Sequence, residues 1–215
     1  MEKVLSELNK HYPIKIKNKS DSTLMIILSW IMFFNRQFMT HYVTTVGSTI
    51  YMPSMAKDWP RNAILSILTH EFVHVHDGQK DKLFKLKYLF PQILAPLFLA
   101  LLPFCWWLAL VLFVICLLPW PAPWRKKYEL RAYKMSLLGF KAYFEGSRPD
   151  EWIEKELQET AEFQNSQFVG AGYWFMWPWG VKPQLKQAIN DIRTGDIFRE
   201  DGVYAIGYDA IKNSK

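Results

Sequence analysis

Apolar residues recur at helical spacing in several stretches of the chain, and these stretches predict its main helices. In one of them, residues 60–77, Pro60 suits the first helical turn and Asp77-Gly78 is a stop signal. The other stretches are residues 123–146, 148–164 and 183–194, followed by a tail, 196–215, of small helical or irregular structure. The chain is therefore expected to be mostly helical.

Two short stretches rich in β-branched and aromatic residues lie just before the helix at 60–77. They cover residues 42–46 and 49–52 and predict two strands joined by a turn at Gly47-Ser48. The fold class is therefore α+β, mostly helical, with a short β-hairpin or sheet before the first long helix. The 215 residues are one domain's worth of chain, so we expect a single domain over 1–215.

The most unusual pattern is a run of 37 residues, 88–124, that contains no Asp, Glu, Lys, Arg or His. It exceeds the length of about 18 apolar residues that predicts a transmembrane helix. In helical form it reaches about 56 Å, slightly less than two crossings of a ~30 Å hydrocarbon core. We therefore expect an inserted apolar helical hairpin that bends near Pro103, either spanning or re-entrant. The alternative is a hairpin buried in protein or in an oligomer.

The charged residues that flank this run predict on which side of a membrane its ends lie. Lysines between residues 80 and 87 precede it, and residues 125–127 are all basic, which predicts that both flanks lie on the cytoplasmic side. The net charge of +6 favours anionic lipid. Nucleic acid is not an expected partner, because the basic residues form no patch with aromatic support. Cys105 and Cys116 lie within the apolar run and are expected to behave as small hydrophobic residues.

The N-terminal part is expected to carry no signal peptide and to contain a buried helix. Residues 1–22 are polar and charged, which indicates no signal peptide. Residues 23–34 form an apolar run that is too short to span a membrane. We expect a buried helix there, packed under the helix at 60–77, and the alternative is a helix in the membrane interface.

The helix at 60–77 carries the motif His-Glu-x-x-His. Residues four apart share one helix face, so His70 and His74 can direct both imidazoles at one metal ion. Glu71 projects about 100° away and is the candidate general base, which takes a proton from zinc-activated water and later gives it to the leaving amine. His76 faces elsewhere and is expected to be a polar residue near the helix end.

A catalytic zinc site needs a third protein ligand and an open position for water. Glu-x-x-Ala at residues 129–132 resembles the third-ligand helix of gluzincin metallopeptidases, especially the HtpX and prenyl-protein-processing peptidases. Those enzymes also place a membrane hairpin between the two ligand helices. The resemblance implies that Glu129 is the third ligand, with Glu145 as a weaker alternative. The metzincin subfamily is excluded, because Lys80 stands where its members have a third histidine.

The resemblance has further implications and one departure. It implies that the strand before the helix is a sheet edge that pairs with an extended peptide substrate. Tyr133 stands where the family has an Asp that supports a ligand histidine, and Asp77 is the candidate substitute. A tyrosine often stabilises the oxyanion in such enzymes. Tyr133 and Tyr173 are candidates, and the sequence selects neither.

These features predict a membrane-associated zinc metalloendopeptidase. It would bind one Zn²⁺ per chain through His70, His74 and Glu129 and hydrolyse a peptide or protein with water activated by zinc and Glu71. Lipid contact is expected through residues 88–124, with the catalytic part on the cytoplasmic side, and oligomers are compatible with the sequence. The alternatives are a catalytically idle membrane or assembly protein that retains a zincin fold, and a structural component of a membrane surface. The presence of Glu71 argues against an idle site, because a structural zinc site needs no general base.

Overall fold

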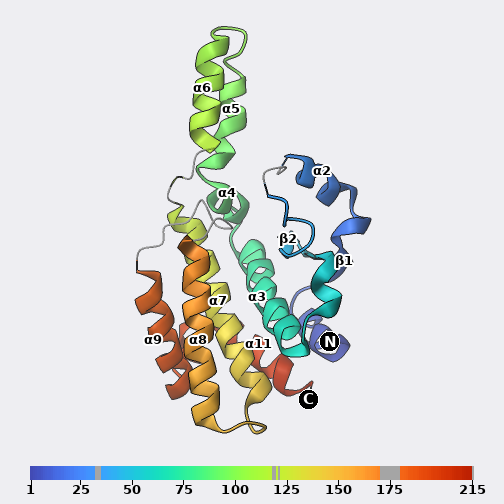
Figure 1. The fold of residues 1–215 in the computed structure, drawn as a ribbon, viewed down its shortest axis with the longest axis vertical. Coiled ribbons are helices and arrows are strands. Elements are labelled where there is room, and N and C mark those ends of the chain that lie inside the picture. The colour runs from blue at the N-terminus through green and yellow to red at the C-terminus, as the bar shows by residue number, and fades with distance from the viewer. Residues whose placement is uncertain (32–34, 118–119, 121, 170–179, 215) are drawn as a thin grey trace.

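The computed structural model describes residues 1–31, 35–117, 120, 122–169 and 180–214, and this part of the chain is mostly helical (Figure 1). The helices are α1 (Glu2–Asn9), α2 (Thr23–Ile31), α3 (Arg61–Lys80), α4 (Phe84–Leu89), α5 (Ala95–Leu99), α6 (Trp106–Leu117), α7 (Pro123–Phe144), α8 (Asp150–Val169), α9 (Val181–Thr194), α10 (Ile197–Glu200) and α11 (Gly202–Lys212). The strands are β1 (Lys15–Asn18), β2 (Thr44–Val46) and β3 (Thr49–Met52), and short 3₁₀ helices are η1 (Lys19–Asp21), η2 (Ser54–Asp58) and η3 (Gln92–Leu94). The prediction of a mostly helical α+β chain is confirmed.

The small sheet has the strand order β1-β3-β2. The expected hairpin is present, with Thr45 opposite Ile50 in an antiparallel pair and a turn in which Gly47 has a φ of +62°, a conformation that favours glycine. β1, which the sequence analysis did not anticipate, adds to β3 in parallel. The strand that directly precedes α3, β3, is therefore the central strand, and β2 is an edge strand.

At the centre of the molecule α3 packs against α7, and α11 contacts both helices (Figure 1). Their shared core contains the fully buried side chains of Leu68, Phe72 and Leu137. The two helices approach closely at Gly139, where a β-carbon would lie 2.9 Å from Thr69 Oγ1. This close approach fixes the histidines of α3 beside the first turns of α7.

The ends of α3 and the position of α2 differ from expectation. α3 continues past the predicted stop to Lys80, because Gly78 is tolerated inside the helix and the amide of Asp81 still donates to the Asp77 carbonyl (2.8 Å). The buried helix expected at 23–34 is wrong over its described part. α2 exposes most of its apolar side chains, with Trp30 78% exposed, and among the described residues of α2 only Met25 is fully buried. Residues 32–34 lie outside the described part.

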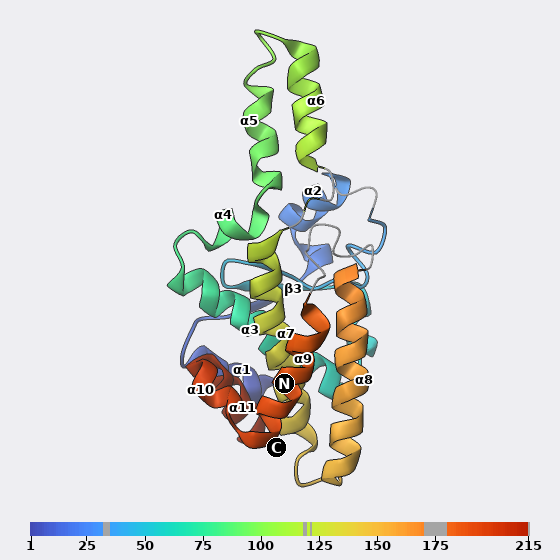
Figure 2. The same ribbon diagram turned by 90° about the vertical axis from the view of Figure 1, so that its left-hand side faces the viewer.

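α5 and α6 lie side by side and project from the rest of the molecule (Figures 1 and 2). The chain reaches them through α4 and returns into α7, and α4 and α7 contact each other. The expectation of a transmembrane helix is wrong, since no helix within the described residues combines the length and apolarity needed to cross a bilayer. The turn around Pro103 divides the apolar run, so that α6 has 12 residues and is about 18 Å long.

Candidate metal centre

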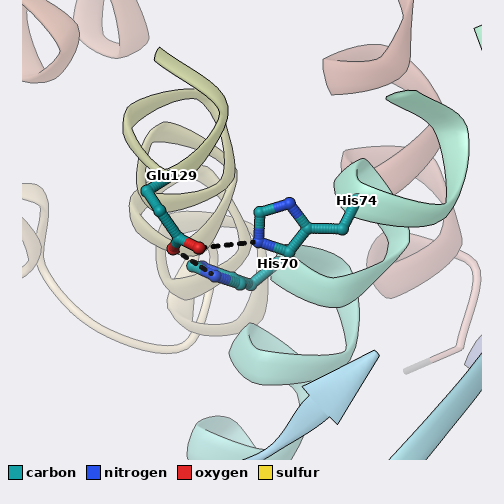
Figure 3. A group of neighbouring side chains, drawn as sticks. All are labelled: His70, His74 and Glu129. Atoms are coloured by element: carbon teal, nitrogen blue, oxygen red, sulfur yellow. Dashed lines mark ion pairs between the residues drawn. The ribbon is translucent and has the colours of Figure 1, made fainter. Parts of the chain in front are cut away.

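Two helices bring three metal-binding side chains together (Figure 3). His70 and His74 lie one turn apart on α3, and Glu129 lies on α7 opposite them. The Nε2 atom of His70 is 3.5 Å from Glu129 Oε2, and the Nε2 atom of His74 is 3.5 Å from Glu129 Oε1. One ligand atom from each residue lies within 4.8 Å of the other two, so this group can bind a metal ion.

Burial and unsatisfied atoms support a metal site at this place. Glu129 is 2% exposed, and both histidines are 8% exposed. The Oε2 atom of Glu129 is buried and has no hydrogen-bond partner in the described structure. A buried carboxylate oxygen without a donor is costly. A cation placed among the three side chains would satisfy it, so the residues fit a metal ion.

The electrostatics of the three side chains also favour a cation at this place. Burial lowers the pKa of His74, but the Glu129 carboxylate outweighs this effect and raises that pKa to about 9. Burial also works against the charge on Glu129, yet His74 and His70 hold the pKa of its carboxyl well below the ordinary value. The pocket therefore favours a positive charge next to an ionised Glu129.

Neighbouring side chains orient the candidate ligands. Ser136 lies two turns after Glu129 on α7, and its Oγ is 3.2 Å from His70 Nδ1 and donates to the Ala132 carbonyl (3.3 Å). Because that hydroxyl proton is already engaged, the Ser136 oxygen can accept from Nδ1–H, which leaves the His70 Nε2 lone pair for a metal. The Tyr133 ring meets the His70 ring edge-on at 4.9 Å. Tyr133 thus supports a ligand histidine by packing.

The expectation that Asp77 supports a ligand histidine is wrong. Asp77 instead pairs with Arg131 (Nη1–Oδ1 3.0 Å) and lies 3.3 Å from His76 Nδ1. The Nδ1 atom of His74 has no hydrogen-bond partner in the described structure. Arg131 also pairs with Asp201 at the start of α11. This network therefore fastens α3, α7 and α11 to one another beside the metal centre.

The candidate base Glu71 is held by the sheet. Its Oε2 accepts a hydrogen bond of 2.7 Å from Thr45 Oγ1 on the edge strand β2. Glu71 is 8% exposed, and its negative charge contributes to the raised pKa of His74. The candidate base therefore follows the candidate ligand His70 on α3 and is anchored by β2. It is not one of the three side chains that could bind the metal.

The other candidate residues lie away from the three side chains or outside the residues that the structure describes. His76 is buried against the Tyr12 ring (5.4 Å between ring centroids), as expected of a residue that is not a ligand. Glu145 follows the end of α7, where it accepts from Tyr208 and pairs with Lys212, so the structure does not bring this alternative ligand to the site. Tyr173 lies outside the described residues.

Sequence reasoning missed Tyr88, whose hydroxyl donates to Glu129 Oε1. Tyr88 is the first residue of the apolar run, and no motif signalled that its helix would cover the histidines. Ser136 could have been found, because it shares a face of the predicted helix with Glu129 at the seven-residue spacing. Comparisons of the chain with protein-family models, with curated proteins and with solved structures found no match.

Proposed function

We propose that this protein is a zinc-dependent metalloendopeptidase of gluzincin type. The observation that carries the proposal is the convergence of His70, His74 and Glu129 from two helices, with Glu71 next to them. Two imidazoles and one carboxylate are a donor set typical of catalytic zinc, and three protein ligands leave a position for water. The resemblance of the two motifs to gluzincins adds to this argument.

The chain's own residues have distinct tasks in the proposed reaction. His70, His74 and Glu129 would hold the zinc, which would supply Lewis acidity that makes a water more acidic near neutral pH. Glu71 accepts the proton of the attacking water and donates it to the leaving amine, which matches a carboxylate held by one hydrogen bond from Thr45. The shielding of the site from solvent strengthens these electrostatic interactions.

The edge strand β2 gives the substrate a place to bind. Within the part of the chain that the structure describes, β2 pairs with β3 on one side only, and it contacts α3. A peptide in extended form can add to the free edge through backbone hydrogen bonds, which tolerate many sequences. Thr45 lies in β2 and contacts Glu71, so a peptide bound there would pass close to the base. The substrate class is therefore an extended peptide or an unfolded segment of a protein.

The test is hydrolysis of fluorescein-labelled casein by the wild type, Glu71→Gln and Glu145→Gln. We expect Glu71→Gln to retain its zinc and to lose about 10²–10⁴-fold in kcat, which is the usual contribution of a general acid-base group. Glu145→Gln removes a carboxylate remote from the site and should retain activity. A wild type that binds zinc and hydrolyses neither casein nor a peptide library would favour the catalytically idle alternative.

We also propose that residues 88–124 contact the surface of an anionic lipid bilayer. The tip of the α5–α6 projection exposes large apolar side chains, among them Phe104 at 87% and Trp106 at 66%. Exposed lysines lie at its base, including Lys82 and Lys127. Apolar rings at the tip and lysines at the base match the acyl boundary and the anionic headgroups of such a surface.

Flotation with phosphatidylserine vesicles tests this lipid contact. The double variant Phe104→Ser/Trp106→Ser should lose most of its vesicle binding, while Phe163→Ser, which changes an exposed ring on α8, should retain it. Binding that is equal for both variants would refute the contact. Binding to purely zwitterionic vesicles that matches binding to phosphatidylserine vesicles would refute the role of the lysines.

A further inference from the structure

The short helix α4 covers the metal centre with two aromatic side chains. Phe84 and Tyr88 lie one turn apart on α4, and their ring centroids are 6.3 Å and 5.8 Å from that of His74. The Tyr88 hydroxyl donates to Oε1 of Glu129. The other carboxylate oxygen, Oε2, has no hydrogen-bond partner in the described structure. The two oxygens of one candidate ligand are therefore not equivalent.

Tyr88 is itself fixed to the helix that carries Glu129. Arg125 lies one turn before Glu129 on α7, and its Nε donates to the Tyr88 carbonyl (2.8 Å). The Arg125 guanidinium also lies 5.2 Å from the centroid of the Tyr88 ring, and its Nη2 donates to Gln92 Oε1 (3.2 Å). Arg125 is only 9% exposed, so these contacts are shielded from water. The phenol is thus held in place from two sides.

We infer that Tyr88 is a positioning residue for Glu129 in the zinc site. Its hydroxyl donates to Oε1, which weakens that oxygen as a metal ligand and favours coordination through Oε2. A carboxylate that is free on both oxygens can bind a metal through both, which would fill the position that catalysis needs for water. Outer hydrogen bonds of this kind commonly fix the orientation of a ligand. The inference rests on the proposed function, because it assumes that the three side chains bind zinc.

The test compares Tyr88→Phe with Tyr128→Phe. Tyr128 is a matched control, since its hydroxyl donates to Asp81 Oδ2 (2.7 Å) and not to a ligand, although its ring packs on the same helix at Phe84. Zinc affinity is measured by competition with a chromophoric chelator. We expect Tyr88→Phe to bind zinc about 10–100-fold more weakly, the usual effect of losing an outer partner, and Tyr128→Phe to match the wild type.

Cobalt substitution separates positioning from a general loss of structure. A four-coordinate Co²⁺ site absorbs visible light more strongly than a five-coordinate one, so a carboxylate that binds through both oxygens weakens the band. We expect a weaker band in Tyr88→Phe and an unchanged band in Tyr128→Phe. Arg125→Lys removes the Nε donor but keeps Tyr88, and it should shift zinc affinity in the same direction by a smaller factor.

The outcomes distinguish this inference from the proposed function. A wild type that binds no zinc overturns both. Zinc binding by the wild type that is lost in Glu129→Ala but equal in Tyr88→Phe, with an unchanged cobalt band, overturns the role of Tyr88 alone. Weaker zinc binding in Tyr88→Phe together with a weaker cobalt band supports it.

Discussion

The close approach of α3 and α7 at Gly139 gives a sharp test of how the site is assembled. In Gly139→Ala the new methyl group would lie 2.9 Å from Thr69 Oγ1 and 3.2 Å from Ile211 Cδ1. Thr69 Oγ1 contacts both the Leu65 carbonyl (3.1 Å) and the Ser66 carbonyl (3.0 Å) as a donor, so a shift of the threonine would disturb these contacts. Such overpacking costs about 1–3 kcal/mol. Alanine in a helix recovers about 1 kcal/mol relative to glycine. The variant should therefore be about 1 kcal/mol less stable than the wild type.

Gly78→Ala is the matched control for Gly139→Ala. Its methyl group would lie 3.5 Å from Phe84 Cδ1, which is ordinary contact, so it should gain up to about 1 kcal/mol. Urea unfolding of the zinc-free variants should separate them by about 2 kcal/mol. Adding Thr69→Ala should recover part of the loss in Gly139→Ala, which a double-mutant cycle measures. A Gly139→Ala variant as stable as Gly78→Ala would refute the close packing of α3 on α7.

Four further variants probe buried charges and the surroundings of the candidate ligands. Burial lowers the pKa of Lys19 from 10.5 to about 8, and Glu71 offsets only part of this, so the folded state binds fewer protons than the unfolded state between these values. The free energy of unfolding should therefore rise from pH 8 to 10.5 by up to about 3 kcal/mol, and Lys19→Met should flatten this rise in urea titrations. Arg131→Ala leaves the buried Asp77 without its cation and should cost about 3 kcal/mol. Lys134→Ala, which breaks a pair with an exposed carboxylate, should cost less than about 1 kcal/mol in the same assay. Ser136→Ala should weaken zinc binding by about 10-fold in a chelator competition, and an unchanged affinity would remove the serine from the site.

Much of the fold followed from local patterns. The helical spacing in residues 60–77 and 123–146 predicts α3 and α7, and the turn at Gly47-Ser48 predicts the hairpin. The pairing of β1 did not follow, because its four residues carry no clear alternation and gain their partner only from β3. The exposure of α2 also did not follow, since an apolar run specifies a helix but not what covers it.

The apolar run at 88–124 shows a second limit. Its composition satisfies the length rule for a transmembrane helix, but its prolines and the turn around Pro103 divide it into pieces, and α6 is the longest helix described within it. Hydropathy along a chain therefore overstates the length of a helix when breakers lie inside the run.

The candidate site also combines residues that local spacing predicts with residues that only tertiary packing brings together. His70, Glu71 and His74 are fixed by spacing on one helix, which the sequence contains in full. Glu129 was proposed through a resemblance, and its approach to the histidines depends on how α3 packs on α7. Tyr88 and Thr45 reach the site from α4 and β2, so their contacts are products of tertiary structure that no local pattern records.

The most direct measurement is the zinc content of the wild type, Glu129→Ala and Glu145→Gln, purified without chelator and analysed by inductively coupled plasma mass spectrometry. The proposed site predicts about one zinc per chain in the wild type and in Glu145→Gln, and its loss in Glu129→Ala. A wild type without zinc, or a Glu129→Ala variant that retains it, would contradict the three-ligand site.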